Sequence, residues 1–199
     1  MAHVITLTGP SQCGKSVVVD MLMKAESPDF RPILVPKYVT RDKRDTDGSD
    51  VICCREIPKD CDMVYEQYAY RYGFSFDTLY RHLKQNQCPI VIINDIKVLQ
   101  DMRRALGSQV LSIYIYRKMP ILQNFIDEET RRAGEGVDPE RIRDIATSRY
   151  HKAVTIYRIY IENIALFDSV LLNVDTYDST QIQVENIVGQ IAKPKKYLK

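Results

Sequence analysis

The chain has 199 residues, of which 45% are hydrophobic and 27% charged, and its formal net charge is +2. This composition is typical of a soluble globular protein, and the length suffices for one α/β domain with a sizeable core. The near balance of charge argues against a large nucleic-acid-binding surface. No apolar run approaches the roughly 20 residues that span a bilayer, so we expect neither a nucleic-acid partner nor a membrane segment.

The first residues, MAH, lead directly into an apolar run, and we expect no signal peptide before it. The cysteines form an odd set without a paired motif, which is typical of free thiols in a reducing compartment. They are Cys13, Cys53, Cys54, Cys61 and Cys88. The spacing of the middle three matches no usual zinc pattern. We therefore expect a cytoplasmic protein without a structural zinc site.

Residues 3–18 carry the most informative motif. The apolar run VITLT at 4–8 is followed at 9–16 by GPSQCGKS, which fits G-x-x-x-x-G-K-[ST] at every fixed position. An amphipathic stretch at 17–25 comes next. Strand, glycine loop and helix in this order distinguish a phosphate loop from a chance match.

The residue types in this loop suit ATP and Mg²⁺. Gly9 and Gly14 allow loop amides to turn toward phosphate oxygens, and the dipole of the following helix favours the same negative charge. Lys15 is expected to reach the transferred phosphoryl group, and Ser16 to hold Mg²⁺. The loop positions between the glycines that complete the predicted phosphate site are Ser11, Gln12 and Cys13. Cys13 is interpreted as a small spacer, with a reactive thiol as the alternative.

A strand is expected at 33–35, and after it comes the cationic segment KYVTRDKR at 37–44. Arg41 and Arg44 are three residues apart and can converge on one anion, which arginine binds in bidentate geometry. A basic loop that simply faces water is the alternative. Further along, alternating aromatics at 63–76 predict a strand with Tyr68, Tyr70 and Tyr72 on one face and a turn at Gly73. That face can bind a ligand or pack on a helix.

A fully apolar run at 90–93 is typical of a central parallel strand. It ends in Asn94 and Asp95. Ligands of open α/β sheets lie beyond the carboxyl ends of strands, so Asp95 is placed to meet Mg²⁺ or a substrate. Asp95 is equally suited to cap a helix at 96–106, and both interpretations stay open.

The remaining pattern continues the alternation of strands and helices. Strands are expected at 110–116 and 167–173, and helices at 77–85, 119–130, 138–165 and 181–192. A segment with two glycines and flanking arginines at 131–139 suggests a mobile loop. Five strands alternating with helices predict one domain over 1–199 with an α/β fold: a parallel sheet of the P-loop NTPase type, sandwiched by helices, with a β-rich insert at 35–76.

At this point the chain resembles the guanylate kinase family of P-loop nucleoside monophosphate kinases. The resemblance rests on GPSxxGKS at 9–16, VTRxxR at 39–44, Tyr72-Gly73, the strand ending in Asp95, Arg149-x-x-x-Ala153, and Leu171-Leu172-Asn173. It implies that residues 35–76 bind an acceptor and that residues 127–150 form a helical lid. It also implies ATP and Mg²⁺ as cofactors and a nucleoside monophosphate as the small-molecule acceptor.

The resemblance assigns roles residue by residue. Arg41, Arg44 and Tyr72 would hold the acceptor's phosphate, and Arg149 with Arg132 or Arg131 would close on the transferred phosphate. Asn173 would touch adenine. The catalytic set is then Lys15, Arg41, Arg132 and Arg149.

The acceptor-reading positions depart from the family pattern. Lys37 replaces a serine, Cys53 a tyrosine, and Met63 the glutamate that pairs with guanine, a role that Glu66 takes only through a shift in register. Asp95 remains from an acidic pair. Each lost pairing removes about 1–3 kcal/mol of base discrimination. We therefore expect phosphoryl transfer from ATP to a phosphorylated acceptor, with GMP as first candidate. The alternatives are an enzyme similar to ribose bisphosphate phosphokinase, which acts on ribose 1,5-bisphosphate, and a non-catalytic guanylate-kinase-like binding module.

Overall fold

The structure is a computed structural model that describes residues 3–10, 13–43, 47–67, 70–118, 121–133, 136–174 and 176–192. The predictions for Ser11, Gln12, Arg44 and Tyr68 lie outside the described residues, as does the tail at 193–199.

The central sheet has five parallel strands in the order β2-β7-β1-β8-β9. Their bounds are β1 (Val4–Thr8), β2 (Pro32–Leu34), β7 (Cys88–Ile92), β8 (Val110–Tyr116) and β9 (Ser169–Leu172). Every residue of β1 and β7 is buried, as expected for parallel strands covered on both faces. The predicted α/β fold with a parallel sheet between helices is confirmed.

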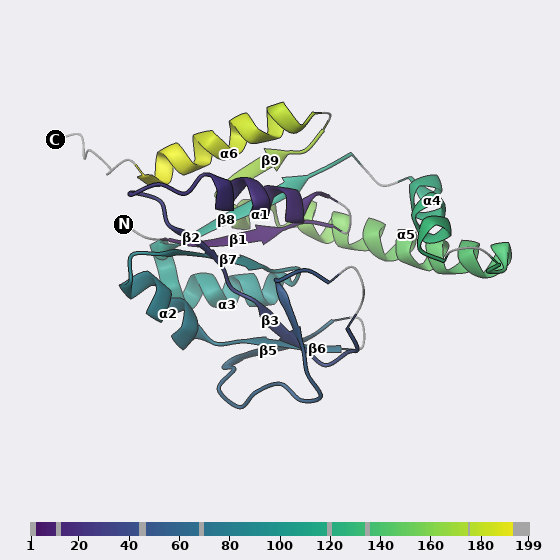
Figure 1. Ribbon diagram of the computed structural model, residues 1–199, viewed down its shortest axis with the longest axis horizontal. Helices are drawn as coiled ribbons and strands as arrows, with labels where there is room; N and C mark the ends of the chain where they lie inside the picture. Colours follow the sequence, from purple (N-terminus) through teal and green to yellow (C-terminus); the bar gives the residue numbers. More distant parts are fainter. Residues whose placement is uncertain are drawn as a thin grey trace.

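Helices cover both faces of this sheet. Figure 1 shows α1 (Lys15–Lys24) and α6 (Tyr177–Ala192) on one face, and α2 (Phe76–Lys84) and α3 (Ile96–Leu106) on the other. The first layer buries an apolar cluster that includes Leu7 and Leu22, and the second buries one that includes Val91 and Leu99. None of the described helices combines the length and apolarity needed to cross a membrane.

A second, smaller sheet lies beside the central one. Its order is β4-β3-β6-β5, from β3 (Lys37–Val39), β4 (Val51–Cys53), β5 (Met63–Gln67) and β6 (Tyr70–Phe74). The turn predicted at Gly73 is wrong, because Gly73 lies inside β6 and pairs with Val64 and Tyr38. A Cβ at Gly73 would come within 2.5 Å of the Cγ2 atom of Ile57, so the glycine is needed for close packing.

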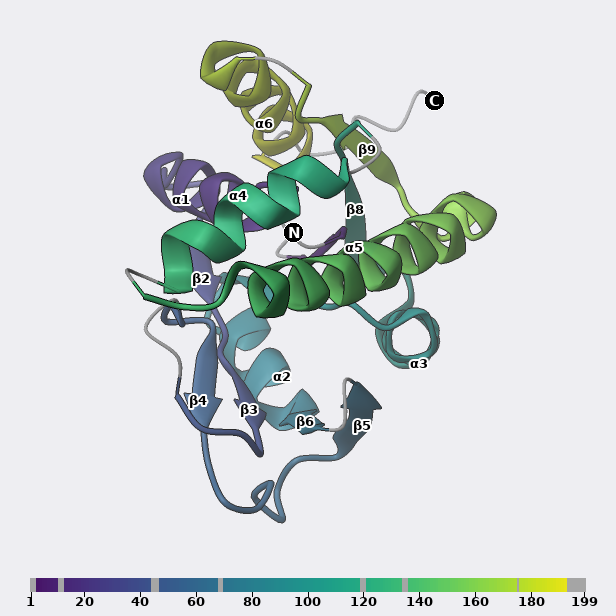
Figure 2. The same ribbon diagram turned by 90° about the vertical axis from the view of Figure 1, so that its right-hand side faces the viewer.

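A helical hairpin forms the third part of the molecule. It consists of α4 (Leu122–Ala133) and α5 (Pro139–Glu162), which pack around Phe125, Ala146 and Ala153. Asp138 caps α5 by accepting a hydrogen bond from the amide of Glu140 at 3.0 Å. Figure 2 shows the hairpin in front of the central sheet with the smaller sheet below it, so the three parts surround the end toward which β1 points in Figure 1. Short 3₁₀ helices precede β8 and β9 (Gly107–Gln109 and Ile164–Leu166).

Candidate functional site

The phosphate loop joins β1 to α1, and contacts with neighbouring groups require both of its glycines. Gly14 has a φ of 92°, in the left-handed region, and a Cβ there would lie 2.3 Å from the Nδ2 atom of Asn173. A Cβ at Gly9 would lie 2.5 Å from the Sγ atom of Cys13. Neither glycine position has room for a side chain, so the loop packs closely at the N-terminus of α1, where backbone N–H groups bind phosphate in many proteins.

Lys15 lies across this loop. Its Nζ atom donates hydrogen bonds to the carbonyl oxygens of Gly9 at 2.8 Å and Pro10 at 2.7 Å. Both acceptors belong to the loop itself, so the ammonium is held where the sequence motif requires it. Ser16 follows in the first turn of α1 and is exposed.

The side chains of Cys13 and Asn173 pack against the loop. Cys13 is 1% exposed, and burial raises the pKa of its thiol although Lys15 acts in the opposite direction. This supports the spacer interpretation, because a thiolate is disfavoured there. Asn173 donates from Nδ2 to the carbonyl oxygen of Cys13 at 2.9 Å, and its Oδ1 accepts a hydrogen bond from Thr180 at 3.4 Å. The carboxamide predicted to touch adenine thus binds the loop backbone.

Arg41 forms a buried ion pair inside the smaller sheet's segment. Its Nη1 and Nη2 atoms donate to the two carboxylate oxygens of Asp47 at 2.6 and 2.5 Å, and both side chains are less than a tenth exposed. The hydrogen bonds to Asp47 hold the pKa of Arg41 above its usual range. The predicted phosphate-binding arginine therefore carries an anionic partner from its own chain, a residue that the sequence did not single out.

Lys37 and two tyrosines line the face of the smaller sheet that turns toward the central sheet. The Nζ atom of Lys37 donates to the carbonyl oxygen of Ile92 at 3.1 Å and lies 5.9 Å from the centre of the Tyr72 ring. Tyr72 stacks on Tyr65 with ring centres 5.3 Å apart. Burial raises the pKa of Tyr65, with smaller contributions from Tyr72 and Asp95, so Asp95 also lies near this face.

The structure separates other predicted acceptor residues from this group. Glu66 follows Tyr65 in β5 and pairs with Arg71, so strand alternation turns it to the opposite face, where it is exposed. Met63 is buried, and so is Phe74, its partner across the hairpin. Apolar side chains therefore fill the end of the hairpin where the family resemblance expects a base-reading carboxylate.

Asp95 lies at the carboxyl end of β7 and caps α3. Its Oδ1 atom accepts a hydrogen bond from the amide of Val98 at 2.9 Å. The capping interpretation is therefore correct, and it engages one of the two carboxylate oxygens. Within the described residues no group of three or more acidic, histidine or cysteine side chains is arranged to hold a metal ion by itself. Mg²⁺ commonly binds to only one or two protein oxygens together with substrate phosphates, which Ser16 and Asp95 would suit.

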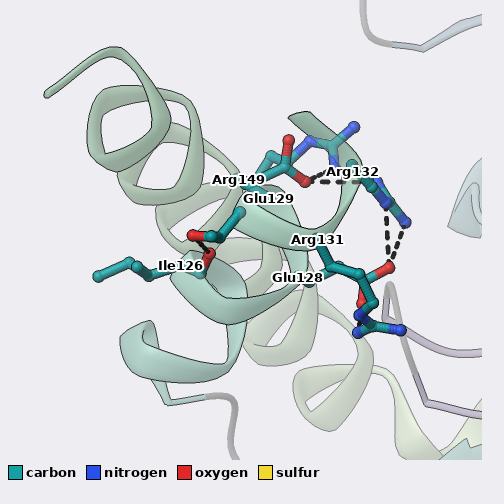
Figure 3. Close-up of polar contacts among 7 residues, drawn as sticks. Ile126, Glu128, Glu129, Arg131, Arg132 and Arg149 are labelled. Carbon is teal, nitrogen blue, oxygen red and sulfur yellow. Dashed lines mark hydrogen bonds and ion pairs between the residues drawn. The ribbon is translucent and has the colours of Figure 1, made fainter. Parts of the chain in front are cut away.

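The arginines of the helical hairpin share acidic partners (Figure 3). Glu129 of α4 accepts hydrogen bonds from Arg132 at 3.3 Å and from Arg149 of α5, and its side chain is 11% exposed. Arg132 also contacts Glu128, which pairs with Arg131 as well. Glu129 therefore contacts both arginines predicted for the lid, and nothing but its charge marks it in the sequence.

The fold of this chain is similar to that of guanylate kinase from Anaplasma phagocytophilum, known from a crystal structure. The two chains are 16% identical, the match covers 98% of this chain and 88% of the other, and the TM-score is 0.64. No protein-family model matches the sequence. No curated protein matches it either. The likeness therefore establishes a guanylate-kinase-like fold, while activity must be argued from the residues.

Proposed function

We propose that this protein transfers a phosphoryl group from ATP to a phosphorylated small acceptor, most simply a nucleoside monophosphate, with GMP as the first candidate. The observation that carries the proposal is the loop at the end of β1, where Lys15 lies against the carbonyl oxygens of Gly9 and Pro10 beside a left-handed Gly14. This geometry suits the β- and γ-phosphates of ATP. The guanylate kinase fold of the structural neighbour agrees with it.

In the proposed reaction the loop amides and Lys15 hold the donor phosphates. Ser16 and the second carboxylate oxygen of Asp95 would hold Mg²⁺, directly or through water, and the ion would neutralise charge on the donor phosphates. Lys15 would exchange the two loop carbonyls for phosphate oxygens. Positioning and charge stabilisation supply most of the catalysis in such reactions, so no covalent intermediate is needed.

The acceptor's phosphate would bind to Arg41 and Arg44 with help from Tyr72, in the segment 35–76. Because Asp47 already occupies the fork of Arg41, the acceptor phosphate must replace that carboxylate or share the guanidinium with it. Either route makes acceptor binding weaker than it would be on a free arginine.

Residues 127–150 would act as the lid, with Arg132 and Arg149 as the cations that approach the transferred phosphate. Both arginines now bind Glu129. On closure they would exchange this carboxylate for phosphate oxygens as negative charge spreads in the transition state.

A coupled assay of ADP release tests the proposal. Wild-type protein with ATP and Mg²⁺ is screened against GMP, dGMP, AMP, UMP, CMP, IMP and ribose 1,5-bisphosphate. Lys15→Ala should lower acceptor-dependent turnover by about 10²–10³-fold, the loss seen when one charge-stabilising donor is removed. Lys24→Ala, an exposed lysine at the end of the same helix, is the matched control and should turn over normally. Near wild-type turnover by folded Lys15→Ala would contradict the proposal.

A non-catalytic binding module is the second candidate, and the paired arginines favour it. Arg41, Arg132 and Arg149 all carry carboxylate partners from their own chain. If the protein binds ATP but releases no ADP with any acceptor in the screen, the binding module is the better assignment. Turnover with ribose 1,5-bisphosphate alone would instead decide for a ribose bisphosphate phosphokinase-like enzyme, which the apolar Met63 and Phe74 favour.

A further inference from the structure

Lys37 carries a buried charge where the smaller sheet meets the central one. Its side chain is 8% exposed and reaches from β3 to the carboxyl end of β7, where Nζ donates to the carbonyl oxygen of Ile92. An ammonium has three N–H groups, and this carbonyl satisfies one of them. Over the parts of the chain that the structure describes, no carboxylate oxygen lies within 4.0 Å of this nitrogen. Burying a charge without such a partner is unfavourable.

The electrostatic surroundings of Lys37 favour an added anion. Burial lowers the pKa of its ammonium to about 8. The charged groups that act on it are Asp50 and Asp47, which oppose the shift, and Lys15 and Arg41, which increase it. The ring of Tyr72 also faces it. Lys15 belongs to the donor loop and Arg41 to the predicted acceptor site, so Lys37 lies where the two halves of the site face each other.

An open pocket adds a second group of cations. It has a volume of about 560 Å³, and the cations that line it are Arg41, Lys43 and Arg55. Lys43 and Arg55 are exposed and form no ion pair with any described residue. Arg41 thus lines this pocket and also acts on Lys37. The smaller sheet therefore carries positive charge both at Lys37 and in this pocket, whereas Met63 and Phe74 provide only apolar surface.

We propose that the acceptor carries a second oxyanion besides the phosphate that is phosphorylated, and that the ammonium of Lys37 binds it. The acceptor is then a small bis-anionic compound, either a bisphosphate or a phosphorylated carboxylic acid. This inference rests on the proposed phosphoryl transfer to a phosphorylated acceptor, and it favours a bis-anionic acceptor over GMP, which carries a single phosphate. The transfer is unchanged: an oxygen of the acceptor's phosphate bonds to the γ-phosphorus of ATP, the bond from that phosphorus to the bridging oxygen breaks, and ADP leaves.

Matched pairs of probes test for the second oxyanion. Ribose 1,5-bisphosphate is compared with ribose 5-phosphate, and 3-phosphoglycerate with glycerol 3-phosphate, so that each pair differs in one phosphate or one carboxylate. Binding is measured by calorimetry with the full chain in the presence of a non-hydrolysable ATP analogue. We expect the bis-anionic member of at least one pair to bind about 10- to 100-fold more tightly, the effect of one charged hydrogen bond. Equal binding within both pairs would overturn the inference.

Variants then locate the effect. Lys37→Met should remove the difference within the pair and leave the affinity for the ATP analogue unchanged, whereas Lys37→Arg should retain part of it. Lys59→Met, at an exposed lysine of the same segment, is the control and should behave as wild type. A Lys37→Met protein that still prefers the bis-anionic probe would overturn the assignment to Lys37.

A measurement on the unaltered protein covers the case in which Lys37→Met fails to fold. In protein carrying ¹³C-labelled lysine, NMR follows the pKa of Lys37 with and without each probe. An oxyanion bound to Lys37 should raise that pKa from about 8, and by more than the single-phosphate member of the same pair does. No change with either bis-anionic probe would overturn the inference.

Failure of the proposed function can be distinguished from failure of this inference. If the proposed function is wrong, no acceptor supports ADP release. If GMP is turned over and Lys37→Met does not change that turnover, only this inference is overturned.

Discussion

The phosphate loop and the smaller sheet are the two places where we propose that an anion binds, and they are built from different kinds of groups. In the loop, backbone groups and the N-terminus of α1 provide most of the binding geometry, and two glycines fix their positions. In the smaller sheet, charged side chains do so, and Arg41 already has a buried carboxylate beside it. A site made from backbone dipoles needs little charge compensation, whereas a site made from buried ions must balance them before a ligand arrives.

The ion pair of Arg41 is the first place to test this difference. Arg41→Ala removes the guanidinium that pairs with the buried carboxylate of Asp47, so the free energy of unfolding should fall by about 3–5 kcal/mol. Replacing both residues, as Arg41→Met with Asp47→Leu, should recover most of that loss, because no buried charge remains. Urea denaturation of the three proteins measures both effects. Arg71→Ala, at an exposed arginine of the same sheet, is the control and should change stability little. An equally small change for Arg41→Ala would show that Arg41 does not compensate the buried charge of Asp47.

Lys37 should make stability depend on pH. The unfolded lysine keeps its proton up to about pH 10.5 and the folded one up to about pH 8. Between these values the unfolded chain binds more protons, so stability rises with pH; below pH 8 the full penalty of the buried charge is present. The difference between wild type and Lys37→Met should amount to about 3 kcal/mol across this window. Denaturation curves from pH 7 to 10.5 measure it, and Lys59→Met should follow the wild-type curve. Parallel curves for wild type and Lys37→Met would refute the expected shift.

A smaller effect is expected in the loop. Gly14→Ala introduces a Cβ near Asn173 and places an alanine at a φ of 92°, which together should lower the free energy of unfolding by about 2 kcal/mol. Adding Asn173→Ala should relieve the contact but not the backbone strain. Gly189→Ala in α6, where a Cβ meets no atom within 4 Å, is the control and should stabilise the protein by about 0.5–1 kcal/mol. Thermal unfolding compares the four proteins; full recovery in the double variant would assign the whole effect to the contact.

The central fold could be predicted because its signals are local. The strands Val4–Thr8 and Val110–Tyr116 and the helix Ile96–Leu106 begin and end at the predicted residues. Apolar runs and a capping aspartate determine those boundaries without reference to distant residues. The α6 helix begins at Tyr177, earlier than predicted, because Thr176 accepts a hydrogen bond from the amide of Ser179 and extends the start.

Of the candidate site, only the loop carries a motif that can be recognised from the sequence alone. The partners of Arg41 and Arg149 are Asp47 and Glu129, and one partner lies in a polar turn while the other lies in a different helix. Sequence spacing cannot choose a partner among many carboxylates. The face on which Glu66 lies depends on the register of β5, and a shift of one residue reverses it.

The hydrogen bond from Asn173 to Cys13 joins residues 160 positions apart. The shape of a loop near the start of the chain therefore depends on a side chain near its end. During synthesis the ribosome releases residues 9–16 long before residue 173, and the sheet must first bring β9 beside β8. Nucleotide affinity should thus arise late in biogenesis, so a nascent chain halted before β9 would have a folded start but a poorly formed loop.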